Sequence, residues 1–241
     1  MDIDEFVRAH EPDETTEAFE LENSKLLDIA VEGSTMAKAG SMVGYTGDVS
    51  FERQSSGGLK GMVKKRVTGE GAVMMRAEGN CHLYLADAGK EVAILELDAD
   101  DELSVNGNDV LAFEESVTSD IKMMDSIAGS SSSGLFNVFL KGPGHIAITT
   151  HGEPLVVPTP VRTDPNATVA WSANVSPSSK RDMNIKTFIG RSSGESFQLD
   201  FAQPDGFVVI QPYEEINPDQ SGSGESGGTG EGIGISDFLG D

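Results

Sequence analysis

Alternating hydrophobic and polar residues run through most of the chain, from about residue 24 to residue 213. A period of two residues indicates a strand with one buried face. The clearest examples are HLYL at 82–85, VAILEL at 92–97, LFNVFL at 135–140, FQLDF at 197–201 and the apolar run FVVI at 207–210. Turn-forming pairs such as Asn106-Gly107 and Asp205-Gly206 separate these segments. The pattern predicts an all-β protein with few short helices, built as a sandwich, a barrel or a β-helix roll.

Two short helices are expected. Near the N-terminus, Ile3, Phe6, Val7 and His10 share one helical face before Pro12 interrupts it. This segment is either a docking peptide or a poorly ordered terminus. The second helix is predicted over residues 119–128, SDIKMMDSIA, with Ser119 as its N-cap.

A short phrase is repeated along the chain. GNCHLYLADAG at 79–89 aligns with GPGHIAITTHG at 142–152, which places His82 on His145. VLAF at 110–113 matches TVAW at 168–171, and weaker copies lie at 40–52 and 205–212. Repeats of one β-rich unit are typical of folds built by stacking like units. A three-fold internal repeat is therefore expected, and such chains are more often assembly subunits than enzymes with one deep pocket.

Composition divides the chain into three parts. Residues 1–22 carry nine acidic residues and one Arg, so they form an acidic N-terminal segment. Residues 23–213 are the repeated β domain. Residues 214–241 hold seven acidic residues and no base, and they are rich in Gly and Ser. This last composition cannot bury enough apolar area to offset the ordering entropy, so a disordered tail is expected.

The net charge of −23 and the pI near 4.3 restrict the partners. An acidic chain repels phosphate backbones, so nucleic acid is not an expected partner. The acidity indicates either a halophilic protein kept hydrated by carboxylates or an ordinary acidic protein. The single Cys81, the absence of an 18-residue apolar run and an N-terminus without an apolar stretch favour a cytoplasmic location.

Two segments are candidates for interactions. Lys60, Lys64, Lys65 and Arg66 form the one basic cluster. It is either a solvated loop or a contact for anionic lipid or an acidic tail, so peripheral membrane contact is possible in principle. The chain end, GIGISDFLGD, carries four large apolar residues: Ile233, Ile235, Phe238 and Leu239. They form either a tethered motif for a protein partner or a loosely packed end.

Candidate chemistry is sparse. His82, His145 and His151 are weak candidates for a metal site, because no Cys-x-x-Cys or His-x-x-x-His spacing accompanies them. The many Ser residues lie in Gly/Ser-rich loops that suit turns, no Gly-x-x-x-x-Gly-Lys-Ser/Thr loop is present, and no Gly-x-Gly-x-x-Gly stands between an expected strand and an expected helix. We therefore expect no cofactor and no catalytic site. Trp171, the only Trp, is expected to be a core residue.

Several motifs together resemble one family. They are AKAGSMVGYTGDVSFE at 37–52, GGLKGMVKKRVTGE at 57–70, LSVNGNDVLAFEESVTSDI at 103–121, SGLFNVFLKGPGHIAITTHGEPLVV at 133–157, DPNATVAWSANV at 164–175 and RSSGESFQLDFAQPDGFVVIQP at 191–212. In this order they resemble the altered-inheritance-of-mitochondria protein 24 family, a mostly uncharacterised group. The acidic composition suggests a halophilic archaeal member.

The resemblance implies three double-stranded β-helix rolls, each like a subunit of the tryptophan RNA-binding attenuation protein. It also implies a symmetric homo-oligomer, with a trimer preferred. From this the expected function is a non-catalytic scaffold or assembly subunit, with a role in membrane organisation as one possibility. A small-molecule or peptide-binding module is the alternative, and an enzyme or metal-binding protein comes third. A shared fold does not by itself carry RNA binding over.

Overall fold

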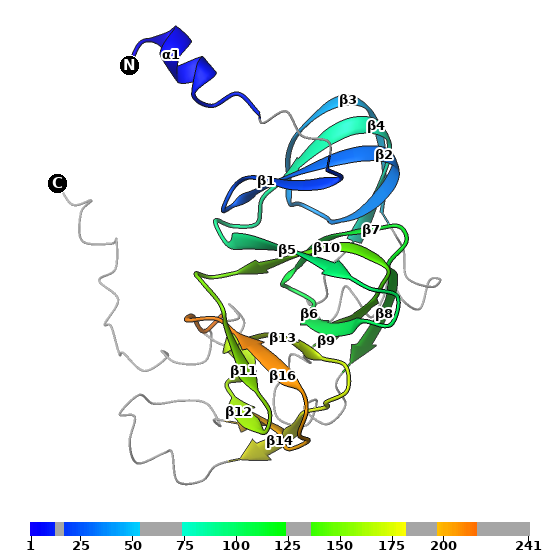
Figure 1. The fold of residues 1–241 in the computed structure, drawn as a ribbon, viewed down its shortest axis with the longest axis vertical. Helices are drawn as coiled ribbons and strands as arrows, with labels where there is room; N and C mark the ends of the chain where they lie inside the picture. The colour runs from blue at the N-terminus through cyan, green and yellow to red at the C-terminus, as the bar shows by residue number, and fades with distance from the viewer. Residues whose placement is uncertain (13–16, 54–73, 124–135, 182–196, 216–241) are drawn as a thin grey trace, which may run out of the picture.

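The computed structural model describes residues 1–12, 17–53, 74–123, 136–181 and 197–215, and strands make up most of them (Figure 1). The prediction of an all-β fold is confirmed. In chain order the elements are α1 (Ile3–Arg8), β1 (Phe19–Asn23), β2 (Leu26–Lys38), β3 (Met42–Arg53), β4 (Met74–Leu85), β5 (Glu91–Leu97), β6 (Glu102–Asn106), β7 (Val110–Glu114), β8 (Thr118–Met123), β9 (Phe136–Lys141), β10 (Gly144–Thr150), β11 (Leu155–Pro158), β12 (Val161–Thr163), the 3-10 helix η1 (Pro165–Ala167), β13 (Thr168–Ser172), β14 (Ser178–Arg181), β15 (Phe197–Phe201) and β16 (Phe207–Ile210).

These strands form three antiparallel sheets. The first has the order β3-β4-β2-β7-β10-β5, with β1 added on β2. The second has the order β11-β16-β13-β6-β9-β8, and the third has the order β12-β15-β14. In Figure 1 the long strands β2, β3 and β4 lie at one end of the molecule, and β12 and β14 lie at the other.

The pairing order recurs along the chain. Strands β7-β10-β5 pair in the same order as β13-β16-β11, six elements later in each case. Strands β6-β9-β8 likewise pair in the same order as β12-β15-β14. The strands of residues 91–150 and those of residues 155–210 therefore follow one pairing scheme.

The long strands β2, β3 and β4 bend at positions where glycines on neighbouring strands lie close together. Gly33 of β2 lies opposite Gly79 of β4. Gly47 of β3 lies one residue before Asp48 and has a φ of +79°. A Cβ on Gly79 would lie 2.0 Å from the carbonyl oxygen of Asp48, so β3 and β4 could not approach this closely with any side chain there.

The buried apolar side chains form three cores. The upper core includes Leu27, Leu83 and Ala147, and the middle core includes Val105, Phe113 and Ile146. The lower core is the smallest, with five buried residues: Trp171, Val175, Leu199, Phe201 and Val208. Trp171 packs edge-on against Phe201, with ring centroids 5.3 Å apart, which confirms its predicted core position.

The predicted helix over residues 119–128 is wrong for the described part of that segment. Residues 118–123 form β8, in which Ser119 lies opposite Leu140 of β9. Local helix propensity is a weak determinant, and an unpaired β9 edge offers six residues a full ladder of hydrogen bonds. Residues 124–128 lie outside the described ranges.

The N-terminal helix α1 stands apart from the sheets. Asp2 caps it, because its Oδ1 accepts a hydrogen bond of 2.8 Å from the backbone N–H of Glu5. No residue of α1 is buried. The strands then begin with Phe19, within the segment that composition assigned to the acidic N-terminus.

Candidate functional site: two open sheet edges and their polar neighbours

Two strand pairs join successive parts of the chain. Strand β2 pairs with β7, which places Met36 opposite Phe113. Strand β6 pairs with β13, which places Ser104 opposite Trp171. Each of these two strand pairs connects one group of strands to the next through backbone pairing, and we call each such pair a junction.

Three strands carry a β-bulge at their second residue. In β7 the register with β10 shifts at Leu111, and in β13 the register with β16 shifts at Val169. In β3 the register with β4 shifts at Val43. The residue two positions after each bulge is aromatic: Phe113, Trp171 and Tyr45. The first half of β3 thus shares its bulge position and its aromatic spacing with β7 and β13.

Only β3 leaves this position uncovered. Phe113 and Trp171 are 2% and 3% exposed, whereas Tyr45 is 50% exposed. Leu111 and Val169 are fully buried, whereas Val43 is 62% exposed. Among the described strands, β3 pairs with β4 alone. Its first half therefore lacks the junction partner that β7 and β13 have, and we call it the β3 edge.

Strand β12 is the complementary open edge. Its spacing to the following strand equals that of β6, because Thr163 precedes Thr168 by the same five residues as Val105 precedes Val110. Within the described ranges β12 pairs only with β15. Arg162 lies on this edge strand with 51% of its side chain exposed, and its Nε donates to Oδ1 of Asp200, its register partner on β15, at 2.9 Å. The β3 edge and the β12 edge lie at opposite ends of the molecule (Figure 1).

A polar cluster lies beside the β3 edge. Nδ1 of His82 donates to Oδ2 of Asp28 at 2.9 Å, and the second carboxylate oxygen of Asp28 has no hydrogen-bond partner among the described residues. Burial, together with the charges of Asp28 and Glu22, raises the pKa of Tyr84. Burial and Asp28 also raise the pKa of Cys81, so its thiol is an inert buried group, not a nucleophile.

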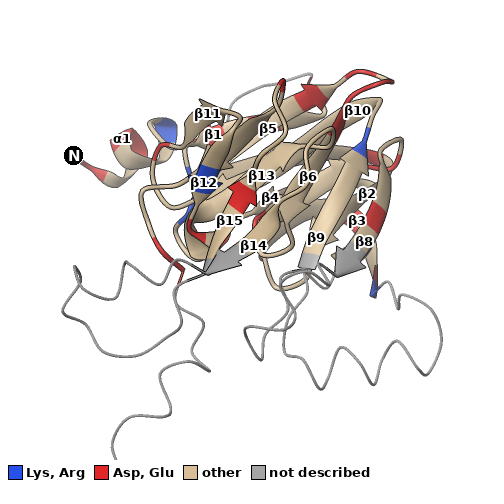
Figure 2. Cartoon of the chain, turned by 90° about the horizontal axis from the view of Figure 1, so that it is seen from below, with Lys and Arg blue, Asp and Glu red and all other residues tan. Residues whose placement is uncertain are grey.

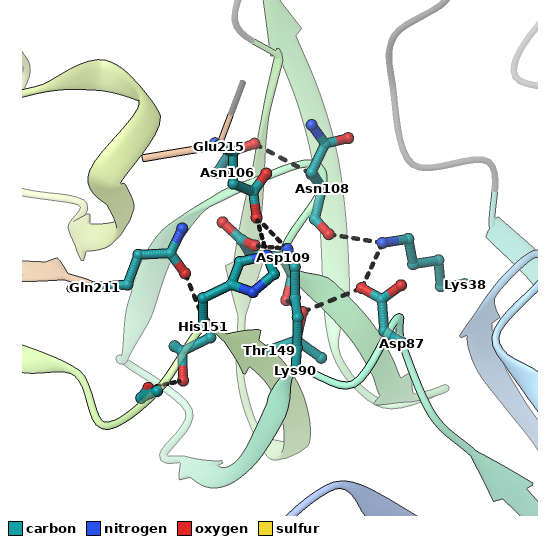
Figure 3. A network of polar contacts seen from close by, with 12 residues as sticks. Lys38, Asp87, Lys90, Asn106, Asn108, Asp109, Thr149, His151, Gln211 and Glu215 are labelled. Carbon is teal, nitrogen blue, oxygen red and sulfur yellow. Dashed lines mark hydrogen bonds and ion pairs between the residues drawn. The ribbon is translucent and has the colours of Figure 1, made fainter. Parts of the chain in front are cut away.

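A second polar cluster surrounds the buried ammonium group of Lys90 (Figure 3). Nζ of Lys90 donates to Oδ1 of Asp109 at 2.7 Å and also contacts Oε1 of Glu215. Burial, which Lys90 opposes and Glu215 reinforces, raises the pKa of Asp109 to about 7. Burial lowers the pKa of Lys90, but its two carboxylate partners outweigh this effect and raise it.

This cluster ties the end of the described chain to the ends of β5, β7 and β10 in the first sheet. Nε2 of His151 lies 3.5 Å from Oε1 of Glu215, and its ring packs on Tyr213 at 4.3 Å. The N–H of His151 donates to Oε1 of Gln211 at 2.8 Å, and the N–H of Glu215 donates to the carbonyl of Asn166 at 3.0 Å. These contacts hold the end of the described chain in place, so the cluster has a structural role.

A further branch of the same region surrounds Lys38 (Figure 3). Its Nζ donates to Oδ2 of Asp87 and to the carbonyl of Asn108, both at 2.7 Å. Thr149 also donates to Asp87, at 3.3 Å. These bonds link β2 to the turns before β5 and β7, so they hold the first junction in place.

A groove of about 440 Å³ lies between β1, β2 and the end of β7. Phe19 forms an apolar wall, and Glu114 and Glu115 supply carboxylates. Nδ1 of His145 lies 3.1 Å from Oε1 of Glu114, and its ring stacks on Phe19 at 6.0 Å. Phe19 is only 4% exposed, and both carboxylates have partners within the chain, because Glu114 accepts from the N–H of His145 and Glu115 is paired with Arg76 at 2.8 Å. A cationic ligand would compete with these partners for the carboxylates.

The three candidate histidines do not form one site. His82 bonds to Asp28 on β2, His145 to Glu114 on β7, and His151 lies against Glu215. Across the described ranges no group of three or more His, Cys, Asp or Glu side chains is arranged to hold a metal ion. The candidate interaction residues Lys60, Lys64, Lys65, Arg66, Ile233, Ile235, Phe238 and Leu239 lie outside the described residues.

The sequence reasoning missed the open edges and the Lys90 cluster. The edges had a signal, because the phrase at 40–52 was noted as a copy of the repeat and Tyr45 falls within it. The Lys90 cluster had none, since its members are separated by up to 125 residues. Figure 2 shows the acidic positions spread over many elements, with few basic ones among them.

The fold is that of an all-β protein with several antiparallel sheets. No helix in the described part of the chain is long and apolar enough to cross a membrane. The profile of mitochondrial biogenesis AIM24 matches residues 19–213, so the chain belongs to the AIM24 family.

Among solved structures, the chain is similar to protein SPYM3_0169 from Streptococcus pyogenes, a structural-genomics target. The two share 21% identity with a TM-score of 0.61, over 81% of this chain and 92% of that one. At this identity the likeness shows the fold alone. No curated protein matches this chain.

Proposed function

We propose that this protein is a non-catalytic assembly subunit that joins other copies of itself head to tail. The β3 edge of one copy pairs with the β12 edge of the next. The exposure of Val43 and Tyr45, at positions that are buried in both internal junctions, carries this proposal. The contact would continue the strand pairing that joins β2 to β7 and β6 to β13 inside the chain, so neither copy has to change its fold. An open strand edge with exposed apolar side chains is stabilised when a partner strand covers it.

The internal junctions set the register of the proposed contact. Phe113 lies opposite Met36, and Trp171 lies opposite Ser104. Ser104 and Arg162 each stand six residues before the first residue of the next strand, Val110 or Thr168. Arg162 of one copy thus lies opposite Tyr45 of the next, where its guanidinium packs on the phenol ring for about 0.5–1 kcal/mol.

Such a contact is heterologous, because the two edges differ. Heterologous contacts form closed rings when the rotation closes and open filaments when it does not. A closed ring leaves no β3 or β12 edge exposed. We prefer a trimer, on the strength of the family resemblance together with three proposed β-roll units in each chain: β2–β4, β5–β10 and β11–β16.

The setting of this subunit is part of the same proposal. The excess of acidic residues supports a salt-rich cytoplasm and argues against a nucleic-acid partner. The family description concerns mitochondrial biogenesis. For this chain that supports a scaffold near a membrane only as a broad analogy.

A binding module is the second candidate, and the groove beside Phe19 and Glu114 favours it. The two functions are compatible, since the groove lies on β1, β2 and β7 and away from the β12 edge. A scaffold requires no ligand there. Saturable binding of an amine to a monomeric protein would favour the module.

Size-exclusion chromatography with light scattering tests the assembly. Full-length protein in molar KCl is expected at the mass of three chains. Tyr45→Glu places a charge in the proposed contact and is expected to give monomers with an unchanged circular dichroism spectrum. Ile121→Glu is the matched control, because Ile121 is an exposed apolar residue on another edge strand, β8. A monomeric wild-type chain at every salt concentration would overturn the proposal, as would a Tyr45→Glu oligomer.

A further inference from the structure

An exposed apolar patch lies on the paired strands β11 and β16 (Figure 1). Val156 of β11 is 59% exposed, and Phe207 of β16 is 38% exposed. Pro158 is exposed as well, and it lies opposite Phe207 on the same face as Val156. We call Val156, Pro158 and Phe207 the β11 patch. Among the described strands β11 pairs with β16 alone, and apolar side chains on such an edge are stabilised when another segment covers them.

The paired strands β5 and β10 offer a direct comparison. Ala147 of β10 and Val209 of β16 each pair with the residue directly after a bulge, so the two strand pairs can be aligned by register. In this alignment the β11 patch matches the following residues: Ile94 for Val156, Glu96 for Pro158 and His145 for Phe207.

The matching face of β5 and β10 is covered by an aromatic side chain from β1. Phe19 stacks on the ring of His145, with ring centroids 6.0 Å apart, and Phe19 itself is only 4% exposed. Ile94 is partly buried against the core that contains Phe19. The β11 patch has no such cover among the described residues, which is why Val156 is exposed.

The described chain ends beside the start of β11. A Cβ on Gly152, in the turn before β11, would lie 3.2 Å from Cγ of Pro212. Ile210 pairs with Leu155, the first residue of β11. Glu215 follows Ile210 by five residues and is held by Lys90, so it lies within about 25 Å of the start of β11. The rest of the chain therefore starts from a fixed point close to the patch.

The remaining chain is long enough to return to the patch. Half of the 16 residues at 216–231 are Gly or Ser, and the motif GIGISDFLGD follows at 232–241. A flexible linker of this length has a mean end-to-end distance of about 20–24 Å. This length matches the distance to β11, which is the condition for a high effective concentration of a tethered motif. The motif contains one aromatic residue, Phe238, the type of side chain that Phe19 supplies to β5 and β10.

We infer that the C-terminal motif docks on the β11 patch of the same copy, where Phe238 covers Val156 and Phe207. This inference goes beyond the proposed assembly and does not depend on it. Pro158 and Pro154 have no backbone N–H, so β11 offers only a short ladder of hydrogen bonds to a neighbour. Packing of apolar side chains therefore holds the motif in place.

The charges predict how docking depends on salt. Asp237 and Asp241 belong to the motif, and the exposed Glu153 stands just before β11. Apolar attraction therefore acts against repulsion between like charges. At 1 M salt the Debye length is about 3 Å, so this repulsion is screened. Docking should be tighter by a factor of about three or more in molar KCl than in 0.1 M KCl, which is opposite to the behaviour of a contact between unlike charges.

Fluorescence anisotropy of a labelled peptide of residues 232–241 tests the docking in molar KCl. Three full-length proteins are compared: the wild type, a variant with Phe238→Asp and Leu239→Asp that leaves the patch free, and the same variant with Val156→Glu added. We expect the free patch to bind the peptide with a Kd of about 0.1 mM. The wild type should bind it about tenfold more weakly, because its own motif competes at an effective concentration of about 1 mM. Val156→Glu should raise the Kd at least about tenfold.

Two controls separate docking from loss of fold. Ile121→Glu, added to the free-patch variant, changes an apolar residue with 44% exposure on another edge strand, and it should leave the Kd unchanged. A peptide with Phe238→Ala should bind the free patch more weakly, and this comparison uses one and the same protein.

Several outcomes would overturn the inference. They are no peptide binding by the free-patch variant at 1 mM, equal affinity of that variant and the wild type, and equal effects of Val156→Glu and Ile121→Glu. A lower oligomer mass of the free-patch variant in light scattering would show that the motif reaches a neighbouring copy, so docking within one copy would be wrong. A monomeric wild type that meets the peptide expectations would overturn the assembly and leave the docking standing.

Discussion

Nζ of Lys90 lies 2.7 Å from Oδ1 of Asp109, and both side chains are almost completely buried. Glu215 contacts the same ammonium group from the end of the described chain. One lysine is therefore the shared cation of two carboxylates that come from distant parts of the sequence. The balance of these three charges decides how the stability of the fold responds to pH and to substitution.

The first prediction concerns pH. The pKa of Asp109 in the folded protein is about 7, above its ordinary value of 3.8, so the folded protein keeps a proton that the unfolded chain has lost. The free energy of unfolding should therefore fall as pH rises from 4 to 7 and level off above 7. Asp109→Asn removes this dependence, which is worth up to about 4 kcal/mol. Urea unfolding of both proteins from pH 4 to pH 8 measures the difference, and parallel curves would contradict it.

The second prediction concerns the lysine itself. Lys90→Met leaves Asp109 and Glu215 without their cation, and it should lower the free energy of unfolding by about 3–5 kcal/mol at pH 8. At pH 5 the loss should be smaller, because Asp109 is then protonated. Lys25→Met is the control, since Lys25 is exposed, and it should change stability by less than about 0.5 kcal/mol. Equal losses in the two variants would rule out the buried pair as the cause.

The third prediction concerns the bend of the long strands. Gly79→Ala should destabilise the protein by about 2–4 kcal/mol, because the new Cβ would lie 2.0 Å from the carbonyl oxygen of Asp48. Gly89→Ala meets no atom within 4 Å and bears only the strain of a φ of +75°, so its cost should be about 1 kcal/mol. Thermal unfolding ranks the two variants, and the reverse order would show that β3 and β4 can separate freely.

The fourth prediction concerns the lower core. Trp171→Ala should cost about 3–5 kcal/mol, because it empties the largest site in a cluster of five residues. Phe207→Ala on the adjacent strand β16 should cost much less, since Phe207 is 38% exposed. Chemical unfolding followed by circular dichroism compares them. A loss below about 1 kcal/mol for Trp171→Ala would mean that the third sheet contributes little to stability.

The fifth prediction concerns the fastening of the chain end. A chain ending at Tyr213 loses Glu215 and its contacts with Lys90 and His151, and it should be less stable by about 1–3 kcal/mol. A chain ending at Glu215 keeps these contacts and should match the full-length protein in thermal unfolding. If the two truncated chains unfold at the same temperature, the Glu215 contacts carry no stability.

Local patterns in the sequence predicted the strands well, because the alternation at 82–85 reflects one buried face, with Leu83 and Leu85 buried and His82 and Tyr84 partly exposed. They failed at β8, where pairing with β9 overrides the local preference of residues 118–123 for a helix. They also placed His82 and His145 in matching positions, yet could not show that each bonds to a different carboxylate. Partners such as Lys90 and Glu215 meet only through tertiary folding, which no local pattern encodes.

The constant five-residue step between Ala37 and Met42, between Val105 and Val110, and between Thr163 and Thr168 has an evolutionary consequence. The step fixes only the number of residues between the two strands, so many different side chains are compatible with it. A protein that shares 21% identity with this chain has the same fold. One residue inserted into such a step would turn the following strand over and expose its apolar face. Substitutions should therefore accumulate at these turns across the family, while insertions and deletions are excluded from them.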